Sequence, residues 1–241
     1  MKLKNEDTTL LVAALSLCRT LEINAVVVSE GMIRGCTPSM KIAMLTKTAI
    51  EVPDGTKLGI SRISELDERM KIFSGPVDID CKVNDSGDVS MLSLSGGKTK
   101  LQFRCTKASL IKYPKSNEDD AKAVITLTKA EANQLSRALK SLKAEAAVMA
   151  IDSKGGTSFE AIDATNDKFA MDLETPAYFV DEDANVVHSY EASKFASILA
   201  LAVRDADKVE LTIGEFGSII MQLCGHTILI MPHITGEEDD E

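Results

Sequence analysis

Hydrophobic side chains recur with the spacing of an amphipathic helix in four separate stretches of the chain. These stretches cover residues 10–21, 63–73, 135–142 and 195–202. Apolar residues repeat there at i, i+3, i+4 and i+7, which places them on one face of a helix. We expect the four helices to begin at residues that favour an N-cap, namely Asp7, Ser61, Thr128 and Ser189. Thr128 and Glu131 also have the spacing of a capping box.

After each helix the apolar pattern changes to the period of two that is typical of strands. Behind the fourth helix, Val209, Leu211 and Ile213 alternate with polar residues. The expected strands are residues 23–28, 32–35, 41–45, 79–83, 89–94, 101–105, 147–151, 158–162, 168–173, 209–213, 219–223 and 227–231. Turn-forming stretches such as Asp85–Asp88 and Ser153–Gly156 separate neighbouring strands, as antiparallel hairpins require. The pattern predicts an α+β fold in which a helix followed by an antiparallel meander occurs four times.

Composition limits the kind of protein that this repeat builds. The chain has 241 residues, of which 44% are hydrophobic, so it is long enough for one long or two ordinary domains. Aromatic residues make up 4% and tryptophan is absent, so aliphatic side chains must fill the core. No apolar run approaches the roughly 20 residues of a membrane span, and the start of the chain does not have the pattern of a signal peptide. Five cysteines, odd in number and set in apolar patterns, predict reduced core thiols and a cytoplasmic location.

The formal net charge of −10 argues at first against a nucleic-acid partner. The acidic residues are concentrated, however, at Glu118–Asp120, Asp181–Asp183 and Glu237–Glu241. Basic residues gather on the predicted helices instead: Arg19, Arg62, Arg69, Lys71, Lys129, Arg137, Lys140, Lys143, Lys194 and Arg204. A solvated helix face explains any one of these residues, but the same asymmetry on several repeated helices favours a surface that binds DNA. On the second helix, acidic residues reduce this excess of positive charge.

The stretches that suggest catalysis fail when their context is considered. Ser95–Thr99 resembles the end of a phosphate-binding P-loop, but Leu92 stands where that motif needs glycine, and a strand follows in place of a helix. The three histidines do not have the spacing of metal ligands, and no Cys-x-x-Cys occurs. We therefore expect a protein that is not an enzyme and that needs no cofactor or metal.

Several segments of the chain resemble DNA polymerase sliding clamps, the ring-shaped processivity factors that include proliferating-cell nuclear antigen and the clamps of tailed phages. Met1–Leu3 followed by Asp7–Leu11 looks like the start of a phage clamp. The end of the chain is similar to the nuclear-antigen branch: Val209–Ile213, Gly225–His226, then Met231–Ile234 running into an acidic tail. Ser39–Ile42 and Glu131–Leu142 match that branch loosely. The resemblance covers nearly the whole chain at the level of pattern, because clamps carry no catalytic signature.

The resemblance implies two similar domains, each made of two helix-plus-meander units. We expect a clamp domain at residues 1–106, an interdomain connector at 107–123, and a second clamp domain with an acidic tail at 124–241. Three subunits would close head to tail into a ring around double-stranded DNA, without reading its sequence. The implied partners are a DNA polymerase, a clamp loader ATPase and further copies of the chain, with no membrane. If the chain is encoded by a phage, its location would be the host cytoplasm or a replication compartment.

The resemblance also assigns roles to residues. On the helices that would line the hole, the expected DNA contacts are Arg19, Arg69, Arg137, Lys140, Lys143, Lys194 and Arg204. A groove beside the connector would accept short apolar peptides from partner proteins, and its residues would be Met40, Ile42, Leu110, Ile111, Tyr113, Leu229, Met231 and Pro232. Edge strands at Ser90–Leu94 and Phe169–Leu173 would join neighbouring subunits.

Two other classes of function stay open on the sequence alone. One is a non-ring or heteromeric processivity or checkpoint subunit that shares the fold but pairs with different chains. The other is a structural scaffolding protein with no role at DNA. The molar mass in solution separates these classes from a homotrimeric ring.

Overall fold

The computed structural model describes residues 2–3, 5–47, 55–114, 119–180 and 185–233, which fold into two compact units. The N-terminal unit is Met1–Asn117, and the C-terminal unit is Glu118–Glu241. The acidic run at Asp181–Asp183, the acidic tail and residues 115–118 of the expected connector lie outside the described residues. Residues 121–123, at the other end of that connector, belong to a strand.

The described residues form four α-helices, and each overlaps one of the four predicted amphipathic stretches. They are α1 (Asn5–Thr20), α2 (Ile63–Met70), α3 (Lys129–Leu142) and α4 (Ala192–Asp205). A short 3-10 helix, η1 (Ala108–Leu110), precedes the end of the N-terminal unit. The helical pattern thus located every α-helix of the described chain.

The expected N-caps are correct for α3 only. There the Thr128 hydroxyl accepts a hydrogen bond from the Glu131 N–H at 3.2 Å, and the Glu131 carboxylate accepts one from the Thr128 N–H at 2.7 Å. The other three predictions were wrong: α1 begins at Asn5, ahead of Asp7, and the N-caps of α2 and α4 are Arg62 and Glu191. Tertiary contacts override the local preference at two of them. The Ser61 hydroxyl bonds to the Thr106 hydroxyl, and the Ser189 hydroxyl donates to the His233 carbonyl.

The N-terminal unit contains two antiparallel sheets. In the first, the strands are β2 (Val26–Ser29), β3 (Met32–Cys36), β4 (Ile42–Lys47) and β5 (Leu58–Ile60), which lie in the order β4-β3-β2-β5. In the second, β1 (Lys2–Leu3), β6 (Asp78–Val83), β7 (Val89–Gly96) and β8 (Thr99–Arg104) lie in the order β1-β6-β7-β8.

The C-terminal unit repeats this plan. One sheet has the order β12-β11-β10-β14 and consists of β10 (Ala146–Ile151), β11 (Thr157–Ile162), β12 (Lys168–Asp172) and β14 (Val186–Glu191). The other has the order β13-β9-β15-β16-β17 and consists of β9 (Ala121–Thr128), β13 (Tyr178–Phe179), β15 (Lys208–Gly214), β16 (Ile219–Leu223) and β17 (His226–Ile230). Three antiparallel strands follow each helix, so the predicted α+β fold of four helix-plus-meander repeats is confirmed.

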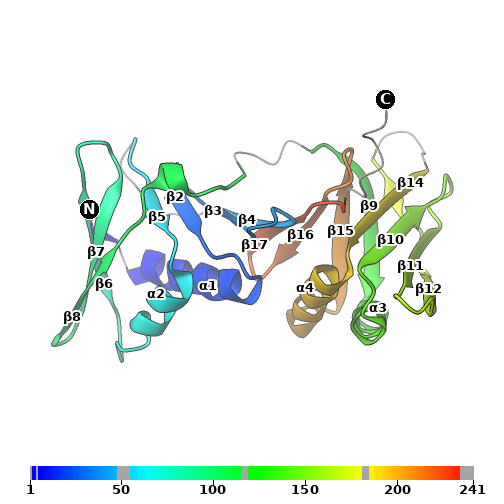
Figure 1. The fold of residues 1–241 in the computed structure, drawn as a ribbon, viewed down its shortest axis with the longest axis horizontal. Helices are drawn as coiled ribbons and strands as arrows, with labels where there is room; N and C mark the ends of the chain where they lie inside the picture. The colour runs from blue at the N-terminus through cyan, green and yellow to red at the C-terminus, as the bar shows by residue number, and fades with distance from the viewer. Residues whose placement is uncertain (1, 4, 48–54, 115–118, 181–184, 234–241) are drawn as a thin grey trace. The chain divides into compact units, whose positions relative to one another are not determined.

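Helices α3 and α4 lie side by side and contact both sheets of the C-terminal unit (Figure 1). Their buried faces are joined by a hydrogen bond of 2.8 Å from the Ser136 hydroxyl to the Ala196 carbonyl. Phe195 packs between the rings of Phe159 and Tyr190, with centroids 5.8 and 5.9 Å away. Most of the remaining core side chains are aliphatic, as the composition predicted.

The stretch that resembles a P-loop is a hairpin turn. Gly96 and Thr99 pair across β7 and β8, which leaves Gly97 (φ 56°) and Lys98 as the turn. All five cysteines lie in the described residues and none forms a disulfide. Cys224 is nevertheless exposed in the β16–β17 turn, so its expected place in the core was wrong. None of the described helices is both long and apolar enough to cross a membrane.

Candidate nucleic-acid interface and partner groove

The helices of the C-terminal unit carry cations outside their buried faces. In α3 the buried residues are Ala132, Leu135, Ser136 and Leu139. Arg137 and Lys140 are exposed on the same helix, and Lys143 caps its C-terminus in the left-handed conformation (φ 55°). The spacing of three keeps these cations on neighbouring positions of the helix surface. On α4, Lys194 is half-buried near the first turn and Arg204 is exposed in the last.

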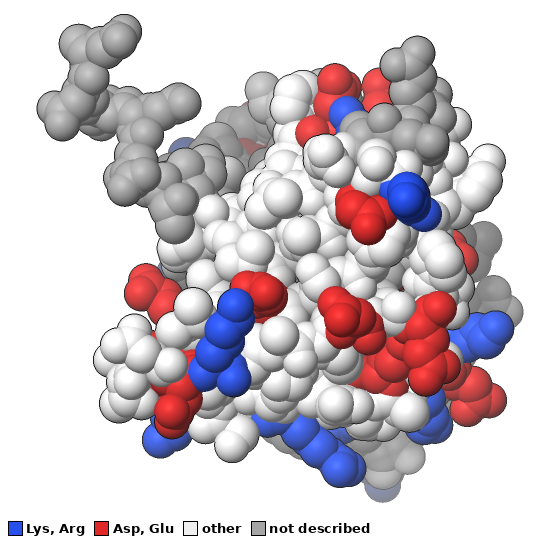
Figure 2. All heavy atoms as spheres, turned by 90° about the vertical axis from the view of Figure 1, so that its right-hand side faces the viewer, with Lys and Arg blue, Asp and Glu red and all other residues white. Residues whose placement is uncertain are grey.

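These C-terminal cations have few acidic partners. Within the described residues, no ion pair involves Arg137, Lys140, Lys143 or Arg204. Lys129 at the start of α3 lies 3.7 Å from Asp207, and both side chains are largely exposed to solvent, so this contact is weak. Figure 2 shows the side of β10, β11 and β12: acidic side chains spread over this face, and basic side chains gather along its lower edge, the edge at which α3 lies in Figure 1.

In the N-terminal unit, by contrast, the cations of the helices form ion pairs. The Asp67 carboxylate is only 3% exposed and lies between α1 and α2. Its Oδ2 is 2.8 Å from Nη1 of Arg19 and 3.0 Å from Nζ of Lys71. Two cations from different helices therefore share one buried carboxylate.

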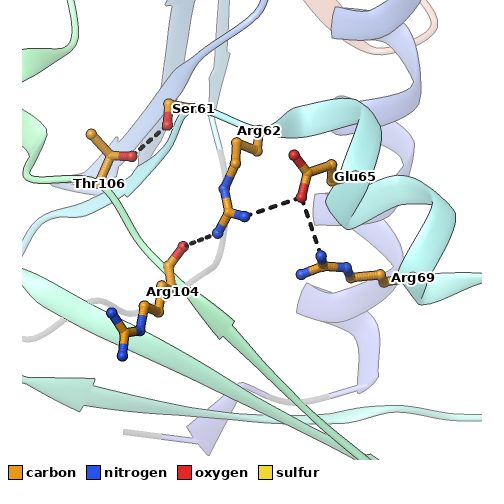
Figure 3. Close-up of polar contacts among 6 residues, drawn as sticks. All are labelled: Ser61, Arg62, Glu65, Arg69, Arg104 and Thr106. Carbon is orange, nitrogen blue, oxygen red and sulfur yellow. Dashed lines mark hydrogen bonds and ion pairs between the residues drawn. The ribbon is translucent and has the colours of Figure 1, made fainter.

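A second shared carboxylate holds the arginines of α2 (Figure 3). Glu65 Oε2 is 3.0 Å from Arg62 Nη1 and 3.2 Å from Arg69 Nη2. Arg62 also donates from Nη2 to the carbonyl of Arg104, at 3.1 Å. Both guanidinium groups stack on the buried ring of Phe103, 4.6 and 5.5 Å from its centroid. These arginines join α2 to the end of β8.

The structure thus divides the seven expected DNA contacts into two groups. Lys194, Arg204 and the three cations of α3 belong to the C-terminal unit, whereas Arg19 and Arg69 are engaged in ion pairs within the N-terminal unit. Part of this division is readable from sequence, because Glu65 and Arg69 have the i, i+4 spacing of a helical ion pair. The contact between Arg19 and Asp67 joins residues too distant in sequence to leave such a signal.

Three of the expected groove residues line one hollow in the N-terminal unit. This hollow has a volume of about 690 Å³ and contains Met40, Ile111 and Tyr113. Ile111 packs on Val27 and Ala108, and Tyr113 packs against this cluster, so the segment after η1 lies on β2. Sequence reasoning missed the other lining residues, which precede β5, form the β6–β7 turn or lie in and just after η1: Gly55, Lys57, Ser86, Gly87, Asp88, Ala108, Ser109 and Lys112.

The other expected groove residues are not among those that line the hollow. Ile42 is buried in the core of β4, and Leu110 projects into solvent with 74% of its surface exposed. In the C-terminal unit, Leu229 is buried, Met231 is 39% exposed and Pro232 is half-buried.

One of the two expected edge strands is wrong. Ser90–Leu94 lies in β7, which is paired on both sides, by β6 and by β8. The edge strands of this sheet are β1 and β8, because β8, which overlaps the strand expected at residues 101–105, lies beyond β7. Phe169–Leu173 overlaps β12, which is an edge strand.

Two of the described histidines have a shifted pKa. Desolvation lowers the pKa of His188 and of His226 below the ordinary histidine value, as burial does for any imidazole. Across the residues that the structure describes, no three His, Cys, Asp or Glu side chains are grouped to hold a metal ion.

Comparison with known proteins shows the fold. No protein-family model matches the sequence, and no curated protein matches it. The structure is similar to that of proliferating cellular nuclear antigen from Entamoeba histolytica, with a TM-score of 0.62, 17% identity, and coverage of 92% of this chain and 96% of that chain. It is also similar to the DNA polymerase III subunit beta from Pseudomonas aeruginosa, with a TM-score of 0.66, 14% identity, and coverage of 100% of this chain and 66% of that one. The chain therefore has the sliding-clamp fold.

Proposed function

We propose that the protein is a DNA sliding clamp, which encircles duplex DNA as a homotrimeric ring and tethers a replicative polymerase to its template. The observation that carries this proposal is the combination of the sliding-clamp fold with exposed cations on α3 and α4 of an otherwise acidic chain. In this role the protein has no catalytic residue and needs no cofactor.

The chemistry of the α3 and α4 cations suits a protein that slides. Lysine and arginine contacts to phosphates carry no sequence information, so they hold a duplex without fixing a position along it. The acidic remainder of the surface repels the DNA backbone and so limits binding to the helix side. Arg137, Lys140, Lys143, Lys194 and Arg204 would supply these phosphate contacts.

Ring closure needs a contact between two different surfaces of the same chain. Heterologous contacts of this kind close into a ring when the rotation between subunits permits. Strands β8 and β12 are edge strands, one in each unit, and each offers backbone groups that a further strand can pair. We place the intersubunit contact at these two edges, in place of the inner strand β7.

The hollow beside η1 suits the docking of a short peptide from a polymerase or a clamp loader. Met40 is 52% exposed at its rim, and a flexible thioether side chain adapts to several apolar partners. Lys57 and Lys112 lie on the same lining and would favour peptides with acidic residues beside their apolar anchors.

The test combines molar mass with retention on DNA. A homotrimer has a mass of about three times 26.0 kDa. Once loaded, it should stay on nicked circular DNA, leave when the circle is linearised, and lengthen the products of its polymerase. A chain that is monomeric at every concentration and that dissociates equally from circular and linear DNA contradicts the proposal. A stable complex with different chains would identify a heteromeric clamp subunit instead.

A further inference from the structure

We infer that each subunit holds the DNA backbone mainly through α3 and α4 of the C-terminal unit. The basic side chains on α1 and α2 instead form ion pairs that stabilise the N-terminal unit. This inference rests on the proposed function and assigns the two halves of the subunit different roles.

The charge balance of the helices already differs between the two units. Helices α1 and α2 with the two cap residues of α2 carry four basic side chains, Arg19, Arg62, Arg69 and Lys71, against five acidic ones, Glu6, Asp7, Glu65, Asp67 and Glu68. Helices α3 and α4 with their cap residues carry six basic side chains, Lys129, Arg137, Lys140, Lys143, Lys194 and Arg204, against three acidic ones, Glu131, Glu191 and Asp205. The N-terminal helices are therefore close to neutral, and the C-terminal helices are strongly positive.

The contacts of the N-terminal cations make this difference larger. A phosphate that took Arg19 away from Asp67 would leave a buried carboxylate with Lys71 as its remaining ion-pair partner among the described residues. Removing a partner from a buried charge is costly, because the protein interior does not replace the missing hydration. Arg62 and Arg69 are held in the same way by Glu65 and by the ring of Phe103. These four cations offer phosphate little net attraction.

The one acidic side chain of α3 does not neutralise its cations. Glu131 lies at the start of the helix, where its Oε2 accepts from the Thr128 N–H and its Oε1 accepts from the Glu174 N–H at 3.0 Å. Arg137, Lys140 and Lys143 follow in the second half of the helix and at its end. Their counterions are mobile salt ions, and release of such ions on phosphate binding supplies most of the free energy of non-specific DNA binding.

The experiment removes two positive charges from one unit or the other. One variant is Arg137→Gln/Lys140→Gln in α3, and its matched control is Arg62→Gln/Lys71→Gln at the two ends of α2. Both lower the net charge equally. The affinity of the assembled protein for a duplex oligonucleotide is measured over a range of salt concentrations, together with the melting temperature.

We expect the α3 variant to bind more weakly, with a salt dependence that is shallower by about 0.9 in log K against log salt for each phosphate that the protein no longer neutralises. Its melting temperature should stay at the wild-type value. The α2 control should keep the wild-type salt slope and melt at a lower temperature. If the α2 control does not fold, the comparison is made with Lys71→Gln against Lys140→Gln, since Arg19 still pairs Asp67 in the former.

The outcomes separate this inference from the proposed function. An equal decrease of the salt slope in both variants, or a larger decrease in the α2 control, overturns the asymmetry while the protein stays a DNA-binding clamp. A wild-type protein without any salt-dependent affinity for duplex DNA overturns this inference, whereas a loaded protein that leaves nicked circular DNA as fast as linear DNA overturns the proposed function itself.

Discussion

Asp67 shows how one side chain decides the role of its neighbours. Its carboxylate is buried where α1 and α2 meet, and it is paired with cations from both sides. A sequence pattern assigns Arg19 to a basic helix surface, whereas the contact makes it part of the protein's internal structure. The same distinction applies to Arg69, which Glu65 and Phe103 hold.

Replacing Arg19 with methionine should therefore lower stability. The methionine keeps most of the apolar stem but leaves the Asp67 carboxylate without its closest cation. Since Arg19 is itself partly exposed and Lys71 stays in place, we expect a decrease of about 1–2 kcal/mol in the free energy of unfolding. Urea denaturation measures this decrease, and Glu68→Ala on the exposed side of α2 is the control. Equal midpoints for the two variants would show that the ion pair between Arg19 and Asp67 contributes nothing to the free energy of unfolding.

The cysteines should differ widely in their reaction with a thiol reagent. Burial raises the pKa of Cys18 to about 12, and its thiol contacts the Met44 sulfur at 3.7 Å. Cys224 is exposed in a turn. Because reactivity follows access and thiolate fraction, about one thiol per chain should react quickly at neutral pH. Cys224→Ser should remove that fast phase, and persistence of the phase in this variant would contradict the assignment.

At the scale of elements, each helix is placed by its apolar stripe and by contacts that its sequence does not contain. Among the helix caps that the structure describes, the cap of α3 combines a local hydrogen bond with tertiary support, because the Glu131 carboxylate bonds to Thr128 and to the Glu174 N–H. Strand β9 was not among the expected strands, although its buried residues alternate with half-buried ones. It pairs with β15, Leu127 opposite Val209, and so depends on residues far along the chain.

Because of the cap of α3, the stability of the protein should decrease as the pH falls into the acid range. Desolvation raises the pKa of Glu131, but the hydrogen bonds from Glu174 and Thr128 outweigh it and lower the pKa below the ordinary 4.5. A group whose folded pKa is lowered stabilises the fold fully above its unfolded pKa and loses that contribution as the pH falls through the folded value.

We expect Thr128→Ala to cost about 1 kcal/mol near neutral pH, where the carboxylate is ionised. Glu131→Gln should be less stable than wild type at neutral pH, and the difference should shrink as the pH falls below about 4.5. Thermal unfolding of both variants between pH 3 and pH 7 measures the effect, with Ser197→Ala on the exposed side of α4 as control. A constant difference between Glu131→Gln and wild type would exclude this carboxylate as the source.

At the scale of the whole molecule, the proposed ring depends on its edge strands. Strand β8 carries exposed Lys100 and Arg104 beside Gln102, and Ala170 is exposed at the centre of β12. If β8 of one subunit pairs with β12 of the next, a charge at Ala170 lies across from a basic strand. Like charges on paired strands destabilise their contact, and opposite charges stabilise it.

Ala170→Arg should therefore shift dissociation of the assembly to higher protein concentration, by roughly fivefold for a penalty of about 1 kcal/mol. Ala170→Glu introduces a side chain of similar length with the opposite sign and should leave the assembly as stable as wild type or stabilise it. Mass photometry or light scattering over a dilution series follows both variants. The same dissociation curve for both would place the intersubunit contact elsewhere.

The sequence by itself determined the four amphipathic helices, the meander behind each and the hairpin nature of the P-loop-like stretch. Periods of 3.6 and 2 express burial of one face, and residues close along the chain are sufficient to reveal them. Only the tertiary structure decided that β8, and not β7, forms an edge of its sheet. It alone brought Lys57 and Asp88 to the hollow that contains Met40, and Arg19 to Asp67 in one ion pair. Each of these depends on partners distant in sequence, and no local pattern of polar and apolar residues records which distant partner a side chain meets.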